Sequence, residues 1–351
     1  MNFQDGSHFP ENQEKLVITC APYGPEWMPA DFPEDIPVSM PDQIQKAVDC
    51  YNAGATVLHV HVREADGKGS KRLSKFNELL AGIRARVPDL ILQVGGSISF
   101  APENEGDSAK WLSDDTRHML AELTPTPDQV TIAINSNQMN VVEQMCEADV
   151  AGTSLAEPAN YRAYREMTIP AGPEWVEEHI KRLSAKGIQT HFQLATISQL
   201  ETVERMMRRG VSNVPLILTW VAIGGGFDAP NLYNLANFVR GCPDGSVLTL
   251  ETSMRNVLPL NMMAIAMGLH VRCGIEDNIW NQRQTAKMGT VAQIEQLVRM
   301  AREFGRDVAN GEEARQIYKI GTFYKDADET LAKNGFAPNR LPGQVGFLQH
   351  A

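Results

Sequence analysis

No run of about 18 apolar residues occurs anywhere in the sequence, so a helix that crosses a membrane is not expected. Basic residues are also in deficit. The 32 Lys and Arg against 43 Asp and Glu give a formal net charge of −11, which argues against a nucleic-acid-binding protein. The first 15 residues are polar and lack the apolar centre of a signal peptide. These absences predict a cytoplasmic protein that binds neither membranes nor nucleic acid.

Cysteine pairs are missing as well. The chain has five cysteines, an odd number, and no two of them form a CxxC motif. A disulfide framework or a cysteine-ligated zinc site is therefore not expected, and free thiols fit a reducing cytoplasm.

What the sequence does contain is a repeated alternation of strand-like and helical segments. Eight apolar, strand-like runs are each followed by a helical pattern, and the connections are too long for hairpins, which indicates a parallel sheet. An open doubly wound sheet is the competing architecture, but no GxGxxG follows the first strand. We therefore predict a (β/α)₈ TIM barrel with long βα loops and a C-terminal extension. The expected strands are 16–20, 55–63, 90–95, 128–135, 188–194, 214–222, 247–251 and 269–275.

This reading divides the chain into three parts. Residues 1–14 form a flexible N-terminus, residues 15–320 a single barrel domain, and residues 321–351 a C-terminal tail. A helix is expected near 111–123, and residues 137–170 are expected to form a long insertion above the core.

The second expected strand reads ATVLHVHVR and holds two histidines two residues apart. Side chains at i and i+2 of a strand point to the same side, so His59 and His61 share one face and can bind one metal ion. An HxH pair is often incidental, but two unpaired imidazoles in a buried strand would be costly. Catalytic groups of barrels lie at the C-terminal ends of strands, and the eighth strand closes against the first. Glu276, at the end of the eighth strand, is therefore the expected third ligand of a zinc site.

Arg272 and Asp277 form a second pair on the eighth strand. A buried guanidinium needs an anionic partner, and Asp277 can serve as a base beside a bound substrate. A buried ion pair that holds the barrel closed explains the same two residues equally well. Glu251 also lies at the end of an expected strand, but the sequence pattern assigns it no role.

Four motifs together resemble the β-keto acid cleavage enzyme family. They are VITCAPYGPE, AGATVLHVHVREADG, PDLILQVGGS and MGLHVRCGIEDN, and the resemblance covers residues 16–315. It implies a (β/α)₈ barrel, one zinc ion per chain and a homotetramer. It also implies a transferase reaction in which a β-keto acid condenses with acetyl-CoA to give acetoacetate and a new acyl-CoA.

Carried onto this sequence, the resemblance places zinc on His59, His61 and Glu276, and makes Asp277, oriented by Arg272, the catalytic base. Substrate contacts are implied for a further set of residues: Glu26, Gly96, Ser97 and Thr131.

Strand 188–194 departs from the family pattern. The family often has an acidic run there, whose glutamate binds a substrate amine, whereas this chain has His191 and Gln193 on one face. These two residues are expected to contact the substrate, and their lack of charge favours a neutral or anionic β-keto acid. Strand 247–251 also departs, because LTLETSMRN stands where a glycine-rich turn is expected.

Two other function classes remain open from the residues alone. One is a divalent-metal-dependent aldolase, lyase or hydrolase on the same barrel that does not use CoA. The other is a non-catalytic barrel in which the polar cluster has no chemical role.

Overall fold

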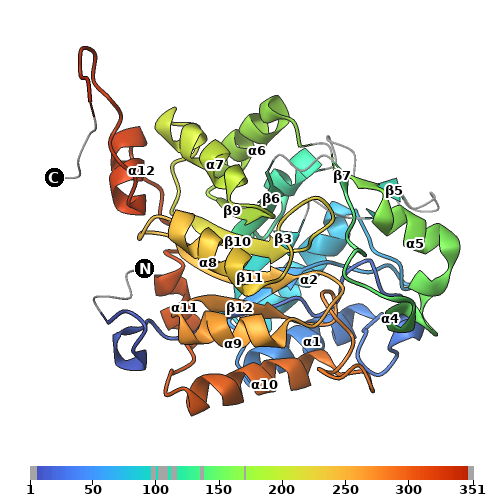
Figure 1. Cartoon of the computed structure of the whole chain (residues 1–351). Coiled ribbons are helices and arrows are strands. Elements are labelled where there is room, and N and C mark those ends of the chain that lie inside the picture. Colours follow the sequence, from blue (N-terminus) through green and yellow to red (C-terminus); the bar gives the residue numbers. More distant parts are fainter. Residues whose placement is uncertain are drawn as a thin grey trace.

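The computed structural model describes residues 6–95, 100–101, 110–111, 117–134, 138–169 and 171–346. Eight parallel strands form a closed barrel surrounded by helices (Figure 1), which confirms the expected (β/α)₈ fold. The strands follow one another around the barrel in chain order. They are β1 (Ile18–Cys20), β2 (Val57–Val60), β3 (Ile91–Gly95), β6 (Gln129–Ala133), β9 (Gln189–Leu194), β10 (Ile217–Ala222), β11 (Val247–Thr252) and β12 (His270–Cys273).

Barrel closure joins the first and last strands. In β1, Thr19 is in register with Arg272 of β12 on one side and with Val57 of β2 on the other. The two strands that bear the histidines and the Arg–Asp pair are therefore both neighbours of β1, as the sequence predicted.

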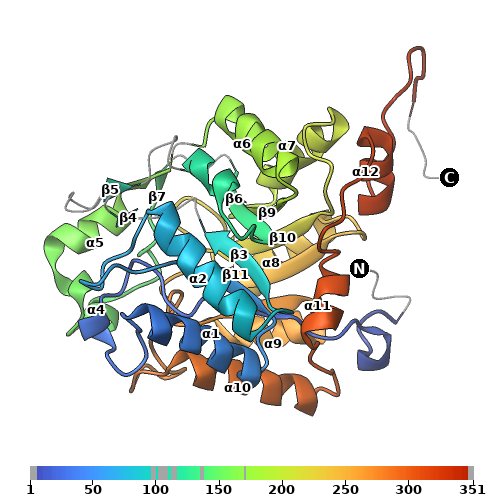
Figure 2. The ribbon, with the colours of Figure 1, turned by 180° about the vertical axis from the view of Figure 1, so that it is seen from behind.

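The outer helices begin and end where local sequence signals place them. In α1, the Ser39 side chain accepts a hydrogen bond from the Asp42 N–H, and the helix ends at Gly54 with φ 119°. Figure 2 shows α1 and α2 side by side on the outside of the barrel. The helices that follow strands are α1 (Met40–Ala53), α2 (Leu73–Arg86), α6 (Pro173–Ala185), α7 (Ser198–Arg208), α8 (Leu232–Gly241), α9 (Leu258–Ala266) and α10 (Thr290–Glu303).

The N-terminal end of the barrel is closed by α11 (Gly311–Ile317). Ala314 and Tyr318 pack there against the first residues of several strands, including Val57 and Val247. His270 lies at this end: it is buried, and its Nδ1 accepts a hydrogen bond from the Val17 N–H. This position gives His270 a structural role.

The long βα loops lie at the opposite end. The insertion after β6 contains a two-stranded antiparallel sheet of β7 (Gln138–Met139) and β8 (Met167–Thr168). The helices α4 (Glu147–Val150) and α5 (Pro158–Arg165) lie between these strands in the chain. The expected helix near 111–123 is wrong in part. Lys110–Trp111 instead forms β5, which pairs with β4 (Phe100–Ala101), and cross-strand aromatic residues favour such pairing.

The C-terminal extension begins with α12 (Ala327–Asn334), which packs against α7. The Asn334 side chain accepts a hydrogen bond from the Leu216 N–H at 2.8 Å, so this helix is tied to the entry of β10. Asn339 Nδ2 donates a hydrogen bond to the Arg208 backbone oxygen of α7 at 3.0 Å, and beyond Asn339 the chain extends away from the barrel (Figure 1).

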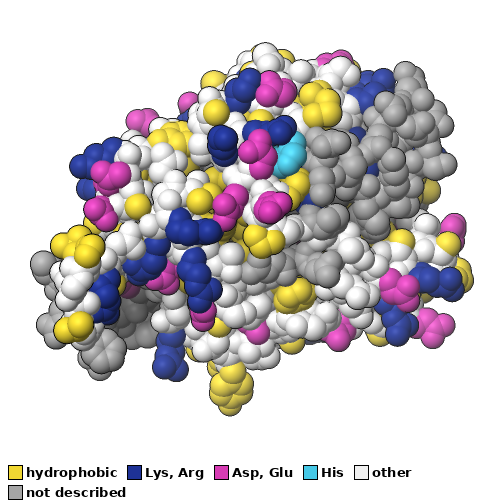
Figure 3. Space-filling model, turned by 90° about the horizontal axis from the view of Figure 1, so that it is seen from above, with side chains coloured by type: hydrophobic (Ala, Val, Ile, Leu, Met, Phe, Trp, Pro, Cys, Tyr) yellow, Lys and Arg dark blue, Asp and Glu magenta, His cyan; other side chains and the backbone are white. Residues whose placement is uncertain are grey.

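Acidic and basic side chains alternate on the face shown in Figure 3, rather than gathering by sign. Within the described ranges, no helix is both long and apolar enough to span a bilayer. All five cysteines are free thiols, as the sequence predicted.

Candidate active site

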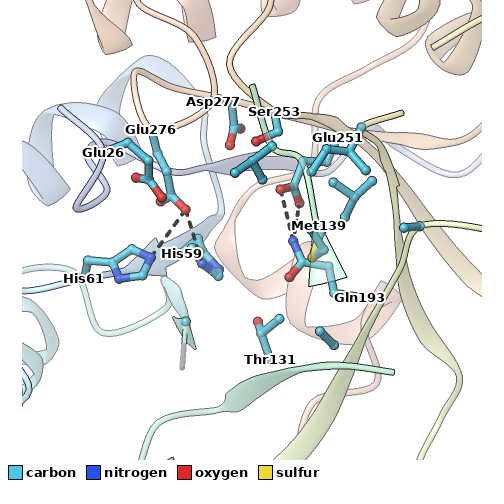
Figure 4. A pocket seen from close by; sticks show the side chains of 16 residues that line it. Glu26, His59, His61, Thr131, Met139, Gln193, Glu251, Ser253, Glu276 and Asp277 are labelled. Atoms are coloured by element: carbon cyan, nitrogen blue, oxygen red, sulfur yellow. Dashed lines mark hydrogen bonds and ion pairs between the residues drawn. The ribbon is translucent and has the colours of Figure 1, made fainter. Parts of the chain in front are cut away.

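A pocket of about 720 Å³, counted out to its opening, lies at the C-terminal mouth of the barrel. Strands from around the barrel, and the loops that follow them, contribute side chains to it (Figure 4). Its polar residues include most of those that the sequence singled out. The polar lining comprises Glu26, His59, His61, Thr131, Gln193, Glu251, Ser253, Glu276 and Asp277.

His59, His61 and Glu276 come together on one side of this pocket. The Nε2 atoms of His59 and His61 lie 3.8 and 3.3 Å from Glu276 Oε1, and one ligand atom from each residue falls within 4.8 Å of the others. Glu276 Oε2 is buried and has no hydrogen-bond partner among the described residues. Two imidazoles and a carboxylate with an unsatisfied oxygen suit a divalent cation such as zinc.

The residues around the histidines preserve this arrangement. His59 Nδ1 lies 2.9 Å from Gln93 Oε1, and Gln93 Nε2 donates to Gln129 Oε1 at 3.0 Å. Gln93 Oε1 therefore accepts a hydrogen bond from the His59 Nδ1–H, which leaves His59 Nε2 free to bind a cation. Burial, helped by the Arg272 charge, lowers the pKa of His59 well below its usual value, so the ring is neutral. Gly95 is required beside it, because a Cβ there would lie 2.3 Å from His59 Nε2.

Arg272 holds three carboxylates at the end of the barrel. Its Nε and Nη2 donate to the two oxygens of Asp277 at 2.9 and 2.7 Å, Nη2 also donates to Glu276 at 3.0 Å, and Nη1 lies 3.3 Å from Glu251. Burial raises the pKa of Asp277 to about 6, although Arg272 opposes the rise. A carboxylate with this pKa, fixed in orientation and facing the pocket, can act as a base near neutral pH.

Glu251 was selected by its place at a strand end, but the sequence gave it no role. Both of its oxygens lie 3.0 Å from Gln193 Nε2, so Gln193, Glu251 and Arg272 form a continuous chain of polar contacts. Burial raises the pKa of Glu251 to about 8, against the effect of Arg272. These contacts link β9 to β12 across the barrel mouth. The spacing of the residues along the sequence does not reveal them.

Glu26 reaches the pocket from the loop after β1. Its Oε2 is buried without a hydrogen-bond partner in the described structure, and burial together with nearby Glu276 raises its pKa well above the usual value. Arg63 positions this loop, because its Nη2 donates to the backbone oxygens of Gly24 and Trp27 at 2.5 and 2.8 Å. The sequence analysis did not identify Arg63, although a buried arginine at a strand end was a usable signal.

The remaining expected substrate residues lie at different depths. Thr131 and Gln193 line the pocket, whereas His191 is one layer deeper and 2% exposed. His191 Nδ1 lies 3.0 Å from the Thr131 hydroxyl and its Nε2 lies 2.8 Å from the Thr219 hydroxyl. His191 can therefore influence a substrate through Thr131. Gly96 and Ser97 lie outside the described residues.

The rest of the pocket lining is apolar and was not identified from the sequence. It consists of Ala133, Met139, Val141, Ala195, Val221 and Ile223. Apolar residues at the ends of barrel strands look like ordinary core residues, so no signal marked them.

The sequence matches a family of known proteins and several named relatives. A family model described as beta-keto acid cleavage enzyme matches residues 15–320. The chain is 26% identical over 310 residues to a 3-keto-5-aminohexanoate cleavage enzyme of Acetoanaerobium sticklandii, a match that covers 88% of this chain and 99% of that protein. It is 24% identical over 318 residues to a 3,5-dioxohexanoate:acetyl-CoA acetone transferase of Paraburkholderia graminis, which covers 88% of this chain and 96% of that protein.

Among solved structures, the apo structure of ObcA resembles the chain with a TM-score of 0.58. The two sequences are 12% identical, and the match covers 82% of this chain and 66% of that one. At this identity the likeness extends to the fold alone.

Proposed function

This chain belongs to the beta-keto acid cleavage enzyme family, and we propose that it condenses a β-keto acid with acetyl-CoA to give acetoacetate and a new acyl-CoA. Two relatives support this reaction: one is named as a cleavage enzyme for a keto acid, and the other as a transferase that uses acetyl-CoA. Because β9 places the Gln193 amide in the pocket, with the neutral imidazole of His191 one layer behind it, we propose a neutral or anionic β-keto acid rather than a cationic one.

His59, His61 and Glu276 are proposed to hold one zinc ion per chain. When bound, the ion supplies a Lewis acid that stabilises negative charge developing on the keto oxygen. Gln93 keeps the Nε2 atom of His59 unprotonated for this role. Glu26, on the same side of the pocket, and Thr131 are proposed to orient the substrate, with His191 acting through the Thr131 hydroxyl. Gly96 and Ser97 are proposed as further substrate contacts.

Asp277 is proposed to remove a proton from C2 of the keto acid, with Arg272 fixing the direction of its carboxylate. The C2 carbanion then attacks the thioester carbonyl of acetyl-CoA and expels CoA thiolate. The thiolate attacks the original keto carbon, the bond from that carbon to C2 breaks, and acyl-CoA leaves. Asp277 returns its proton to C2 of the remaining fragment, which is acetoacetate, so atoms and charges balance.

The observation that supports this proposal most strongly is the position of Asp277. It is held by two hydrogen bonds from Arg272, its pKa is raised to about 6, and it adjoins Glu276 of the proposed metal site. A buried ion pair that only closed the barrel would not need to face a pocket.

The test is to incubate purified protein with a panel of β-keto acids, with and without acetyl-CoA, and to detect products by mass spectrometry. We expect acetoacetate and the matching acyl-CoA to appear together, and only when acetyl-CoA is present. Cleavage of the keto acid without acetyl-CoA would instead favour a metal-dependent lyase or hydrolase.

A homotetramer is also proposed. Several large apolar side chains are exposed, notably Tyr233 of α8 at 85%, and Leu341 and Val345 of the extended tail at 64% and 88%. A neighbouring chain that covered the extended tail would bury two of these side chains, and a homotetramer is what the resemblance to the family implies. Light scattering on the purified protein distinguishes a tetramer from a monomer.

A further inference from the structure

The mouth of the barrel is divided into two unlike halves. The neighbouring strands β1, β2 and β12 bring Glu26, the histidines, Glu276 and Asp277 to one half. The neighbouring strands β6, β9 and β10, with the loop around β7, form the other half. Thr131 and Gln193 of this half lie two residues before Ala133 and Ala195, and therefore deeper in the barrel. The apolar side chains of this half we call the apolar arc. The apolar arc consists of Ala133, Met139, Val141, Ala195, Val221 and Ile223. Figure 4 shows Met139 across the pocket from His61 and Glu276.

The apolar arc is a built surface rather than an accidental gap. Val221 is 6% exposed and Ile223 is 1% exposed, yet both line the pocket, so their exposed atoms face its interior. Ala133 ends β6 and Ala195 directly follows β9, and these short side chains leave room beside the larger residues. A hydrocarbon group placed here would leave water for an apolar surface, which is favourable.

Charged groups on the substrate would find no partner in this arc. The acidic side chains among the described pocket residues are Glu26, Glu251, Glu276 and Asp277, and no Lys or Arg is among them. A second carboxylate on the substrate would therefore meet no cationic side chain, and it would lie near the negative charges of Glu276 and Asp277. An ammonium group is not matched either. Glu251, the carboxylate reached from β11, already contacts Gln193 and Arg272, and Glu26 lies in the opposite half.

We propose that the acyl group of the β-keto acid is a short, uncharged aliphatic chain that lies against the apolar arc. This proposal rests on the proposed function. The residues of β9 allow a β-keto acid with a neutral or an anionic acyl group, and the apolar arc narrows that choice to a neutral acyl group. The keto and carboxylate oxygens stay in the half that contains His59, His61 and Glu276. The acyl carbons extend across the pocket toward Val221 and Ile223.

Three β-keto acids with the same six-carbon chain test the proposal. In 3-oxohexanoate the chain ends in a methyl group, in 3-oxoadipate it ends in a carboxylate, and in 5-amino-3-oxohexanoate it bears an ammonium group on C5. With acetyl-CoA at a fixed concentration, we expect kcat/KM to be at least about tenfold higher for 3-oxohexanoate than for either charged acid. Equal or faster turnover of a charged acid would overturn the proposal.

A binding measurement separates this proposal from the proposed reaction. Titration calorimetry of the zinc-loaded protein with each acid, without acetyl-CoA, should give the tightest binding for 3-oxohexanoate. If none of the three acids is turned over but this order of binding holds, the reaction is wrong and the apolar acyl site stands. If turnover occurs but a charged acid binds best, the apolar site is wrong and the reaction stands.

A matched pair of variants extends the test. Val221→Lys places a cation in the apolar arc and should move the preference toward 3-oxoadipate, whereas Val221→Leu should keep the order of the three acids. Circular dichroism checks that both variants fold. If a folded Val221→Lys protein kept the original order, the acyl chain would not lie beside this residue and the proposal would fail. If the variant does not fold, the comparison of the three acids on the unaltered protein still decides.

Discussion

The two halves of the barrel mouth differ in how their side chains are held. We call the half that contains the histidines, Glu276 and Asp277 the reactive half. There Arg272 binds Asp277, Glu276 and Glu251 at once, and Gln93 fixes His59, so each of these polar groups has a set orientation. The apolar arc has only packing contacts, which tolerate exchange of one hydrocarbon group for another. The difference indicates that chemistry depends on the first half and substrate choice on the second. Each change below tests that division.

The largest effect is expected from Asp277→Asn. Asparagine has the same size and can still accept a hydrogen bond from Arg272, but it cannot take a proton from C2. We expect kcat to fall by about 10²–10⁴-fold, the usual contribution of a positioned base, while zinc content stays at one per chain. Steady-state kinetics and elemental analysis of the same sample measure both. Asp49→Asn, on the exposed face of α1, is the control and should retain activity. Full turnover by the Asp277 variant would show that another group is the base.

Gly95→Ala tests the metal ligands without altering any of them. The added Cβ would lie 2.3 Å from His59 Nε2 and 2.9 Å from His61 Nε2, so the imidazoles must move. We expect metal affinity to fall about 10–100-fold, as it does when ligand orientation is disturbed. Competition with a chelator measures the affinity. Gly172→Ala is the matched control, because a Cβ there meets no atom within 4 Å. Equal affinity in both variants would argue against a metal held by these histidines.

This contrast also explains what the sequence could predict. It is costly to bury the histidines of VLHVHV, or the acidic residues of CGIED at a strand end, unless they have a function. The sequence alone therefore indicates them as site residues. Barrel closure then brings Glu276 to the histidines. Val221, Ile223 and Ala195 have no such mark, because apolar residues are expected in any barrel strand. The Gln193–Glu251 contact was also not predictable, since it joins strands that are not adjacent. Only the start of the helix expected near 111–123 was wrong, because Trp111 pairs with β4 instead.

The pH dependence of turnover tests the role of Asp277 without a substitution. Asp277 must be ionised to act as a base, and burial raises its pKa to about 6 against the opposing effect of Arg272. We therefore expect kcat to rise with pH up to about 6 and then level off, with about a tenfold loss for each unit below that value. A pH–rate profile from 4.5 to 8 in the presence of zinc measures it. A profile that stays flat down to pH 4.5 would contradict the raised pKa.

Glu251→Gln should have the smallest effect on turnover, because Arg272 keeps its bonds to Asp277 and Glu276. We expect kcat to fall about tenfold at most, the worth of one hydrogen bond, with KM for the keto acid unchanged.

The pH dependence of the folding stability tests the protonation of Glu251 more directly. Burial raises the pKa of Glu251 to about 8 from its usual 4.5, so the folded protein keeps this proton after the unfolded chain has lost it. Folding stability from this group is therefore present below about pH 4.5 and is lost as pH rises toward 8. Glutamine does not ionise, so urea unfolding at pH 5 and pH 8 should show a smaller loss for the Glu251→Gln variant than for the original protein. Glu295→Gln, on the exposed side of α10, should lose as much as the original protein. An equal loss in all three proteins would mean that Glu251 is ionised throughout this range and that Arg272 outweighs its burial.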